Sequence, residues 1–326
     1  MADGGTSRRG VIAAAAALAT GVAAAARAQG DYPTRPVRLV VAWAPGGSID
    51  TLARRLSQFL SLQTGQSFVV ENRSGATGTI GAAEVARAAP DGYTLLALDS
   101  TYGLMPFTFS RLPFDHASLV PITITGFNPV MLAVHRDSPF RSVDDVVDAA
   151  KRAPDRITYG SGGVGSAVHF ATAAFELAAG VKLYHVPYRG GGEAVQAVMS
   201  KQVDLVFSSP GSAATGAGAL LRPLAITGQA RVKSMPEVPT FAEAGWPGYG
   251  VVHWSGLGCP RGTPVAVMER LYQETVKALQ TAEMQAFLES IAATPGGMSP
   301  PEVAKLLATE TERWREVVQA AGIRAQ

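Results

Sequence analysis

From residue 32 onward, short apolar runs alternate with longer runs whose apolar positions recur at helical spacing. The first part of this pattern predicts strands over 37–41, 67–71 and 93–98, a helix from Ser48 or Asp50 to 62, and a helix over 80–88. The second part predicts strands over 129–135, 157–159, 183–186, 203–207 and 223–227, and helices over 143–152 and 166–178. Repeated strand–loop–helix units indicate an α/β fold, with a parallel sheet covered by helices on both faces.

The length of 326 residues suits about two domains. Two crossings of the chain, near 125–128 and 249–254, divide it into domain I (29–127 plus 253–326) and domain II (128–252). The tail, 265–325, is predicted to be mostly helical and to return to domain I. Crossing twice predicts a hinge and a cleft between the domains.

The N-terminus has the pattern of a signal peptide over 1–28. Arg8-Arg9 precede an apolar stretch, and Ala26-Arg27-Ala28 forms a small-residue site, so we expect cleavage after Ala28. The other interpretation is an uncleaved anchor helix, but the stretch is short for a membrane span and Gly21 interrupts it. Ser7-Arg8-Arg9 leaves open whether export follows the general or the twin-arginine route. Either route predicts an exported protein.

Composition excludes some classes of partner. The net charge is only +2 and no dense run of Lys and Arg occurs, so we expect no nucleic-acid surface. The single cysteine, Cys259, cannot form an internal disulfide and is predicted to lie in the core. Asp204 is predicted to be structural, at the start of a strand.

The residues give no support to catalysis or to a metal site. No serine lies in a G-x-S-x-G turn, and the five histidines lack metal-ligand spacing. No pair of carboxylates stands out as an acid–base set. We therefore predict no catalytic residue, no metal and no cofactor, and we keep an enzyme that uses the same cleft only as an alternative.

Three glycine-rich loops, 44–50, 75–79 and 160–166, each join a predicted strand to a predicted helix. In open α/β sheets, ligands bind beyond the carboxyl ends of the strands, and helix N-termini offer free N–H groups to an anion. Ser48 is a candidate donor, whereas Asp50 either caps its helix or accepts from a ligand ammonium. The hydroxyls of 75–79 are candidate donors, with plain turn chemistry as the alternative.

The loop from Gly160 to Ser166 matches G-x-G-x-x-G, the pattern of a dinucleotide-binding turn. That pattern requires an acidic residue about 20 positions later, at the end of the next strand. Here the next strand is followed by Pro187-Tyr188-Arg189, and Glu176 lies inside the intervening helix. Anion binding by Ser161, Ser166 and backbone N–H groups explains the loop better than nucleotide binding.

Many short motifs recur in a fixed order along the chain. They are Tyr32-Pro33, Pro36-Val37, Ala44-Pro45-Gly46-Gly47-Ser48 with Asp50, Val70-Glu71-Asn72-Arg73 with Gly75-Ala76, Ala89-Pro90-Asp91-Gly92-Tyr93-Thr94, Tyr159-Gly160-Ser161-Gly162 with Gly165-Ser166 and His169, His185-Val186-Pro187-Tyr188, Pro236 with Pro239-Thr240-Phe241, and Pro260 with Gly262-Thr263-Pro264. Together, from about Tyr32 to Gly322, they resemble the Bug-type periplasmic receptors of tripartite tricarboxylate transporters.

The resemblance implies a type II periplasmic-binding-protein fold, with two α/β domains that close around a ligand. It implies a periplasmic monomer that captures a small organic carboxylate, namely a di- or tricarboxylate, an aromatic acid or an acidic amino acid, and delivers it to a membrane permease. The ligand-binding residues that it implies are Pro45, Gly46, Gly47, Ser48, Asp50, Gly75, Ala76, Thr77, Ser161, Gly165, Ser166, His169 and Tyr188. A ligand sensor that feeds a two-component system is the alternative.

The chain departs from the family pattern at two places. Gly190-Gly191-Gly192-Glu193 stands where many relatives carry a longer polar turn, and Trp43 precedes the Ala-Pro pair. Both departures affect the expected cleft, so the identity of the carboxylate stays open. The aromatic residues that either line the cleft or lie in the core are Tyr102, Phe107, Tyr188 and Trp254.

Overall fold

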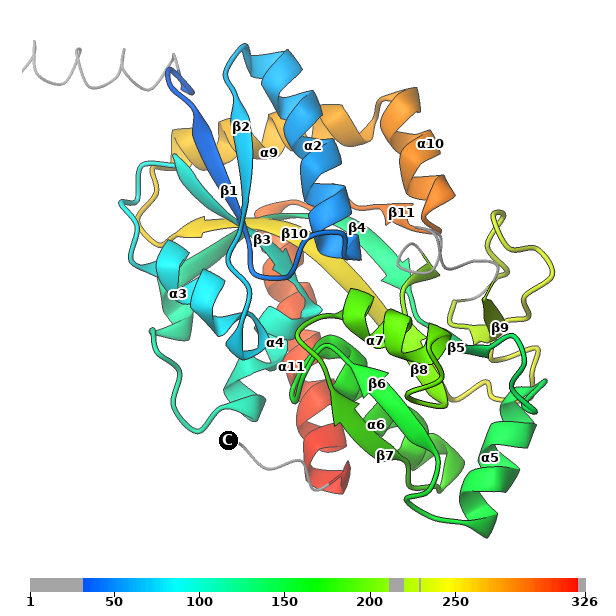
Figure 1. Ribbon diagram of the computed structural model, residues 1–326. Helices are drawn as coiled ribbons and strands as arrows, with labels where there is room; N and C mark the ends of the chain where they lie inside the picture. The colour runs from blue at the N-terminus through cyan, green and yellow to red at the C-terminus, as the bar shows by residue number, and fades with distance from the viewer. Residues whose placement is uncertain (1–31, 211–219, 229, 322–326) are drawn as a thin grey trace, which may run out of the picture.

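The computed structural model describes residues 32–210, 220–228 and 230–321, and its strands form two sheets (Figure 1). The six-stranded sheet has the order β11-β4-β10-β3-β1-β2, and the five-stranded sheet has the order β7-β6-β8-β5-β9. The strands of the first sheet are β1 (Val37–Val41), β2 (Phe68–Asn72), β3 (Thr94–Asp99), β4 (Leu119–Pro129), β10 (Val252–Pro260) and β11 (Thr294–Pro295). Those of the second are β5 (Met131–His135), β6 (Thr158–Ser161), β7 (Tyr184–Pro187), β8 (Leu205–Ser208) and β9 (Leu221–Ile226).

Helices follow most of these strands. They are α2 (Ser48–Thr64), α3 (Thr79–Ala86), α4 (Ser100–Thr108), α5 (Val143–Arg152), α6 (Ala167–Ala179), α7 (Gly191–Met199), α9 (Val265–Leu279), α10 (Ala282–Ser290) and α11 (Pro300–Ala321). None of the described helices is long and apolar enough to cross a membrane. The signal peptide predicted over 1–28 lies outside the described residues, as does the segment 211–219.

Both sheets are mixed, so the prediction of a parallel sheet is wrong for part of each. β1 pairs in parallel with β2 and β3, but β10 runs antiparallel to β3 and β4. In the second sheet, β5 runs antiparallel to β8 and β9. The reason is the connection between the sheets: β4 leads the chain out of the first sheet and β10 leads it back, so the two strands run in opposite directions.

The first sheet is buried on both faces. Val37, Leu39 and Val41 of β1 pack with apolar residues of α2 and α9, whereas Val40 packs on the opposite face with residues of α3, α4 and α11. Such burial explains why β1 is a continuous apolar run rather than an alternating one.

The second sheet is covered by α5 and α6 on one face and by α7 on the other. The C-terminal helix α11 joins the two parts of the molecule: Trp314 packs edge-on against Phe170 of α6, while Val303 lies in the core beside the first sheet. The tail thus does not return to the first sheet alone, and the limits of the two predicted domains stay a prediction.

Several local predictions are confirmed. The helix expected over 143–152 is α5, where the Ser142 hydroxyl accepts from the Asp145 N–H and the Asp145 carboxylate accepts from the Ser142 N–H. Cys259 is fully buried. Asp204 is structural, because its carboxylate accepts from the N–H and hydroxyl of Thr158 and so joins β8 to β6.

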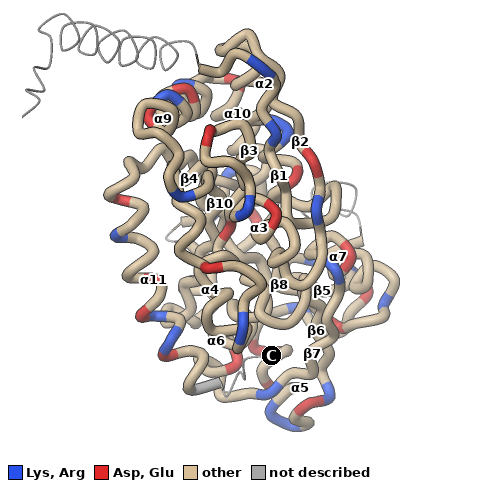
Figure 2. The backbone as a smooth tube through the Cα atoms, turned by 90° about the vertical axis from the view of Figure 1, so that its left-hand side faces the viewer, with Lys and Arg blue, Asp and Glu red and all other residues tan. Residues whose placement is uncertain are grey.

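Charged residues are interspersed in the view of Figure 2, where blue and red segments alternate along α11 and α5. The sequence does not predict the helix α4, because its residues, STYGLMPFT, include Pro106 and have no helical periodicity of apolar positions. The fold nevertheless depends on it, since α4 packs against α6 and α11.

Candidate ligand-binding site

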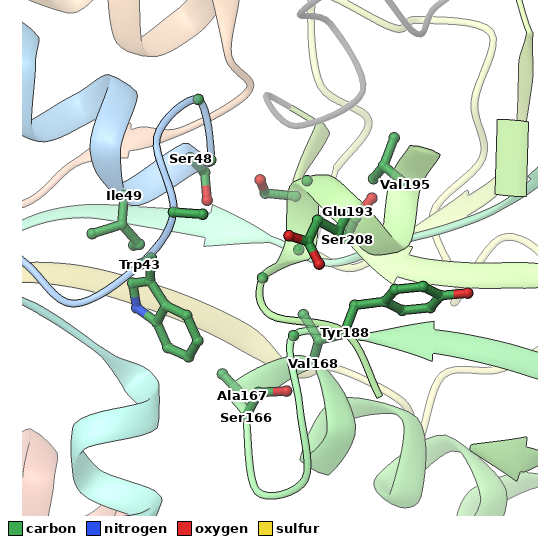
Figure 3. A pocket seen from close by; sticks show the side chains of 18 of the residues that line it. Trp43, Ser48, Ile49, Ser166, Ala167, Val168, Tyr188, Glu193, Val195 and Ser208 are labelled. Carbon is green, nitrogen blue, oxygen red and sulfur yellow. The ribbon is translucent and has the colours of Figure 1, made fainter. Parts of the chain in front are cut away.

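A cavity of roughly 740 Å³ lies between the two sheets. On one side it is lined by the loop that follows β1 and by the start of α4, and on the other by the starts of α6 and α7 and the end of β8. Figure 3 shows Trp43, Ser48 and Ile49 facing Ser166, Tyr188 and Ser208 across this space. The cavity therefore lies where ligands bind in open α/β sheets, at the carboxyl ends of strands.

Four helices begin at the cavity wall. Their N-cap residues are Gly47 of α2, Asp99 of α4, Ser166 of α6 and Gly190 of α7, and all four line the cavity. Each helix N-terminus has unpaired N–H groups and the positive end of the helix dipole. Four of them around one space favour a bound anion.

The four N-termini differ in how they are capped. Asp99 accepts from the Thr101 N–H, and Ser166 accepts from the His169 N–H, so α4 and α6 are capped by their own side chains. Gly47 and Gly190 have no side chain, and neither α2 nor α7 has a side-chain cap. α2 and α7 therefore present their first-turn N–H groups without a side-chain cap.

In the first predicted loop, Pro45, Gly46, Gly47 and Ser48 line the cavity, whereas Asp50 does not. The Asp50 carboxylate accepts from Gly46 N at 2.9 Å, from Arg54 Nε at 2.9 Å and from Asn72 Nδ2 at 2.8 Å. Burial opposes the ionisation of Asp50, but these hydrogen bonds outweigh burial and lower its pKa. Asp50 therefore stabilises the first loop by bonding it to α2 and β2. It is not the N-cap of α2, which is Gly47, and its carboxylate does not line the cavity.

The second predicted loop lies outside the cavity lining. Neither Gly75, Ala76 nor Thr77 contacts the cavity. Instead, the Thr77 hydroxyl donates to the carbonyl of Val164 at 2.9 Å, which joins the second loop to the third. This hydrogen bond joins two of the loops that the sequence predicts to bind the ligand, and the binding role of Gly75, Ala76 and Thr77 stays a prediction.

The third predicted loop contributes Ser166 to the cavity, but not Ser161, Gly165 or His169. Gly165 has φ +78°, and a Cβ on it would lie 1.8 Å from Cγ2 of Thr108. Glycine is needed here because α4 packs directly on the loop backbone.

The side chains of His169 and Ser161 are used inside the protein. His169 stacks on His185 with ring centroids 4.3 Å apart, and its Nδ1 accepts from Gly165 N at 3.0 Å. The Ser161 hydroxyl lies 2.5 Å from Nε2 of His185. Burial lowers the pKa of His169 to about 4. Burial and the neighbouring His169 together lower the pKa of His185 to about 3. Both imidazoles are neutral at pH 7.

Tyr188 and the glycine run after it line the cavity. Glu193 of the first turn of α7 points its carboxylate into this space in Figure 3, and one of its oxygens accepts from Arg189 N at 3.0 Å. The sequence does not decide which aromatic residues line the cavity. Trp254 lines it together with Tyr188, whereas Tyr102 and Phe107 pack against the hydrophobic core.

Sequence reasoning missed several lining residues. Asp99, Asn128, Ser208 and His253 line the cavity although none lies in a glycine-rich loop. Asp99 could have been found from the sequence, because an acidic residue before Ser-Thr at the end of a strand is a common helix N-cap. Asn128 and His253 had none, because they meet only through the pairing of β4 with β10.

The polar side chains that line the cavity are mostly hydroxyls and amides. The lining residues that the structure describes include two carboxylates, Asp99 and Glu193, and no Lys or Arg. Burial raises the pKa of Asp99 to about 6, against hydrogen bonds from Trp43 Nε1 and Thr101 that favour its ionised form. Burial lowers the pKa of His253 to about 4. Within the described chain, no three His, Cys, Asp or Glu residues are placed to hold a metal ion.

Two buried polar atoms of the lining have no hydrogen-bond partner among the described residues. They are Oγ of Ser208 and Nε2 of His253. Unsatisfied buried polar atoms are rare because each one costs free energy. Both atoms are themselves buried, with almost no exposed surface, although their residues line the cavity.

Residues 52–323 match the family model described as tripartite tricarboxylate transporter family receptor. The chain belongs to this family. It is 36% identical over 314 residues to a protein of Pseudomonas sp. (strain P51) named for the tcbD-tcbE intergenic region, covering 95% of this chain and 94% of that protein. It is 32% identical over 312 residues to BugT of Bordetella pertussis, covering 94% and 95%. The predicted resemblance to Bug-type receptors is confirmed.

Solved structures agree in fold. The chain superposes on Rpa4515 of R. palustris with adipate at a TM-score of 0.86 and 34% identity, covering 90% of this chain and 100% of that one. It superposes on MatC of Rhodopseudomonas palustris with bound malate at 0.82 and 30%, covering 88% and 100%. The periplasmic binding protein BugD matches at 0.84 and 29%, covering 90% and 100%. The predicted fold class, that of periplasmic binding proteins, is confirmed, and the chain is a solute-binding receptor of this family.

Proposed function

We propose that this receptor captures a small organic carboxylate in the cavity between its two sheets and delivers it to the membrane permease of a tripartite transporter. The observation that carries the proposal is the convergence of four helix N-termini on a cavity whose described lining has no Lys or Arg. Backbone N–H groups and dipole ends bind a carboxylate without a charged side chain. Two relatives of known structure hold adipate and malate, which supports this ligand class.

One carboxylate group of the ligand binds at the uncapped N-termini of α2 and α7. Their first turns come from opposite sides of the cavity, one following β1 and the other following β7. A ligand that contacts both draws the two sheets together. The predicted domains, 29–127 plus 253–326 and 128–252, then close about the crossings that join β4 to β5 and lead into β10.

A thermal-shift panel tests the ligand class. Di- and tricarboxylates, aromatic acids and acidic amino acids are each added in excess, and a ligand that binds only the folded state raises the melting temperature. The proposal expects a shift with at least one carboxylate, micromolar affinity by calorimetry, and recovery of the ligand chemically unchanged. A panel without any shift contradicts it, and turnover of the ligand would favour the enzyme alternative.

The Ser208→Ala variant tests the place of binding. Ser208 lines the cavity, and we expect the ligand to bond to its hydroxyl, so loss of the hydroxyl should weaken binding of the carboxylate by about 1–3 kcal/mol. The free protein should melt no lower, because this hydroxyl has no partner in the described chain. Ser290→Ala is the matched control, because Ser290 is exposed on α10 and bonds only to Phe287 O in the same helix. Equal affinity in both variants would remove Ser208 from the site.

Delivery and location have tests of their own. Export with cleavage after Ala28 predicts that the mature protein in the periplasmic fraction begins at Gln29, which N-terminal sequencing checks. Delivery predicts that deletion of the receptor abolishes uptake of the labelled ligand in cells that carry the permease. A transcriptional response without uptake would favour the sensor alternative.

A further inference from the structure

The first loop, 44–50, is held at both of its ends by one side chain from outside the cavity. The amide nitrogen of Asn72, the last residue of β2, donates to Trp43 O at 3.0 Å and to Asp50 Oδ1 at 2.8 Å. Trp43 directly precedes the loop, and Asp50 lies in the first turn of α2. Asn72 therefore joins the two ends of the loop, although it does not line the cavity itself.

Asn72 belongs to a closed set of hydrogen bonds. Its Oδ1 accepts from Nη2 of Arg54 at 2.8 Å, while Nε of Arg54 donates to Asp50 Oδ2 at 2.9 Å. Asp50 Oδ2 also accepts from Gly46 N at 2.9 Å, inside the loop. We call these three side chains, Asn72, Asp50 and Arg54, the Asn72 network. None of the three lines the cavity.

The loop backbone has little packing of its own to fix it. A Cβ on Gly46 would have no neighbouring atom within 4 Å, and one on Gly47 would meet only Ala44 O at 3.7 Å. Gly46 has φ +84°, and a glycine backbone loses more conformational freedom on ordering than any other. The same two glycines line the cavity and lead into the uncapped start of α2. Hydrogen bonds from the Asn72 network therefore hold the part of the loop that faces the cavity.

We infer that Asn72 is a positioning residue for ligand binding, which through Asp50 and Arg54 holds the first loop and the N-terminus of α2 in the geometry that receives the carboxylate. The inference rests on the proposed function and deepens it, because it assigns the order of the loop to residues outside the cavity. Binding costs less free energy when the groups that meet the ligand are ordered beforehand. Loss of the network should therefore weaken binding although no contact with the ligand is removed.

The network requires an amide at position 72. An aspartate has nearly the same shape, but it would present a carboxylate oxygen to Trp43 O and to the Asp50 carboxylate in place of two hydrogen bonds. We expect Asn72→Asp to weaken the best carboxylate of the thermal-shift panel by roughly tenfold or more. Calorimetry measures the affinity, well below the melting temperature of each variant, so that only folded protein is compared.

Gln58→Glu is the matched control for the added charge. Gln58 is exposed on α2 and does not line the cavity, and Glu keeps an oxygen for the hydrogen bond from Arg55. The change from amide to carboxylate is the same as in Asn72→Asp, but the loop keeps its network. The affinity should equal that of the unmodified protein, and an equal loss in both variants would overturn the inference.

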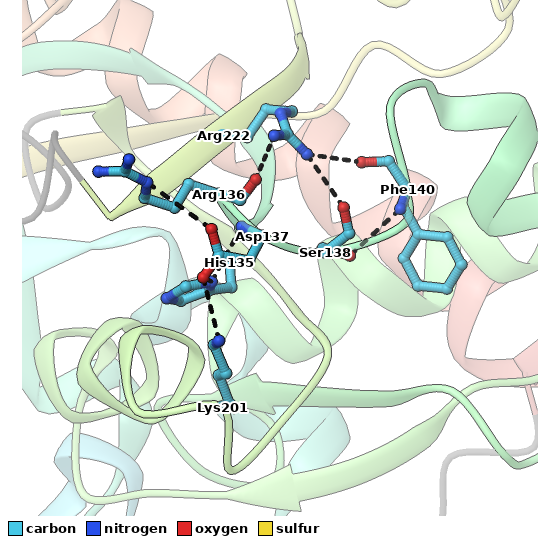
Figure 4. Close-up of polar contacts among 7 residues, drawn as sticks. All are labelled: His135, Arg136, Asp137, Ser138, Phe140, Lys201 and Arg222. Atoms are coloured by element: carbon cyan, nitrogen blue, oxygen red, sulfur yellow. Dashed lines mark hydrogen bonds and ion pairs between the residues drawn. The ribbon is translucent and has the colours of Figure 1, made fainter.

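Asp50→Asn tests the network from its other side. An amide at 50 turns a donor either toward the Asn72 nitrogen or toward Gly46 N, so hydrogen bonds are lost either way, and the affinity should fall by about threefold or more. Asp137→Asn is its control, because Asp137 lies in the exposed cluster of Figure 4, where Lys201 Nζ is 3.1 Å from its carboxylate, and does not line the cavity. An equal loss in both would assign the effect to overall charge and overturn the inference.

Exchange of the two residues separates positioning from general damage to the fold. When Asp50→Asn is combined with Asn72→Asp, the amide at 50 can donate to the carboxylate at 72, while its oxygen accepts from Gly46 N and Arg54 Nε. Only Trp43 O loses its donor, and the net charge is that of the unmodified protein. The double variant should bind at least about threefold more tightly than Asn72→Asp. No recovery in the folded double variant would overturn the inference.

Asn72→Ser keeps the test decisive if Asn72→Asp does not fold. It removes the amide without adding a charge, so binding should weaken by a smaller factor of about threefold. Unchanged affinity in Asn72→Ser would overturn the inference while leaving the proposed function intact. Binding of no carboxylate by the unmodified protein would contradict the proposed function itself.

Discussion

The first and third glycine-rich loops look alike in sequence, but the structure uses them differently. The loop before α2 opens onto the cavity, and its N-cap, Gly47, leaves the helix N-terminus uncapped. The loop before α6 packs against other elements: Ser161 bonds to His185 of β7, and Gly165 packs on Thr108 of α4. Ser166 caps α6 itself. Glycine before a helix thus lets another group come close to the backbone. The neighbouring elements decide what that position faces: Gly47 faces the cavity, whereas Gly165 faces α4.

The largest expected effect is on stability, in the third loop. Gly165→Ala adds a Cβ 1.8 Å from the Thr108 side chain at a φ of +78°, so the free energy of unfolding should fall by about 3 kcal/mol. Denaturant unfolding measures it. Gly191→Ala is the control, because nothing lies within 4 Å of that position and its φ is not positive. Equal stability of the two variants would contradict the packing role of Gly165.

The histidine stack beside the third loop predicts a loss of stability in acid. The folded pKa values of His169 and His185, about 4 and about 3, lie below the ordinary value of 6.5. Both rings are neutral when folded, so their contribution is complete above pH 6.5 and falls as the unfolded state takes up protons between pH 6.5 and 4. The melting temperature should drop by several degrees over that range. His169→Gln should reduce the drop, and an identical pH profile would speak against the stack as its source.

The first and third loops also differ in whether a side chain caps the helix that follows. Ser166→Ala removes the acceptor of the His169 N–H and should lower the free energy of unfolding by about 1 kcal/mol. Ser48→Ala, in the first loop, removes no cap because Gly47 is the N-cap of α2, so stability should hold. Thermal melts of the free proteins compare the two. A larger loss in Ser48→Ala would reverse the assignment.

The smallest expected effect concerns the contact between the second and third loops. Thr77→Val removes the hydroxyl that donates to Val164 O and should weaken ligand binding by about 0.5 kcal/mol, because the contact helps to hold the two sides of the cavity together. Calorimetry against the best carboxylate of the panel measures it. Thr309→Val is the control, because Thr309 is exposed on α11, does not line the cavity and bonds through its hydroxyl to Lys305 O one turn earlier, so its affinity should not change. Tighter binding by Thr77→Val would show that the contact opposes closure.

Much of the fold was determined by the sequence alone. The apolar run of β1, the capping residues of α5 and the alternation of strands and helices predicted most elements to within a few residues, because these signals act between near neighbours in the chain. The order of the short motifs predicted the family. The four residues from Pro45 to Ser48 were correctly expected beside a strand end, and they line the cavity.

Only the tertiary structure decided the rest. The antiparallel course of β10 and the double attachment of α11 depend on contacts between residues more than a hundred positions apart. The packing of α4 against the third loop took in Gly165, and the stack on His185 took in His169. The pairing of β4 with β10 brought Asn128 and His253 together at the cavity. Local pattern specifies which residues can leave N–H groups and acceptors unpaired, but strand pairing and helix packing decide which of those groups face one another across a cavity.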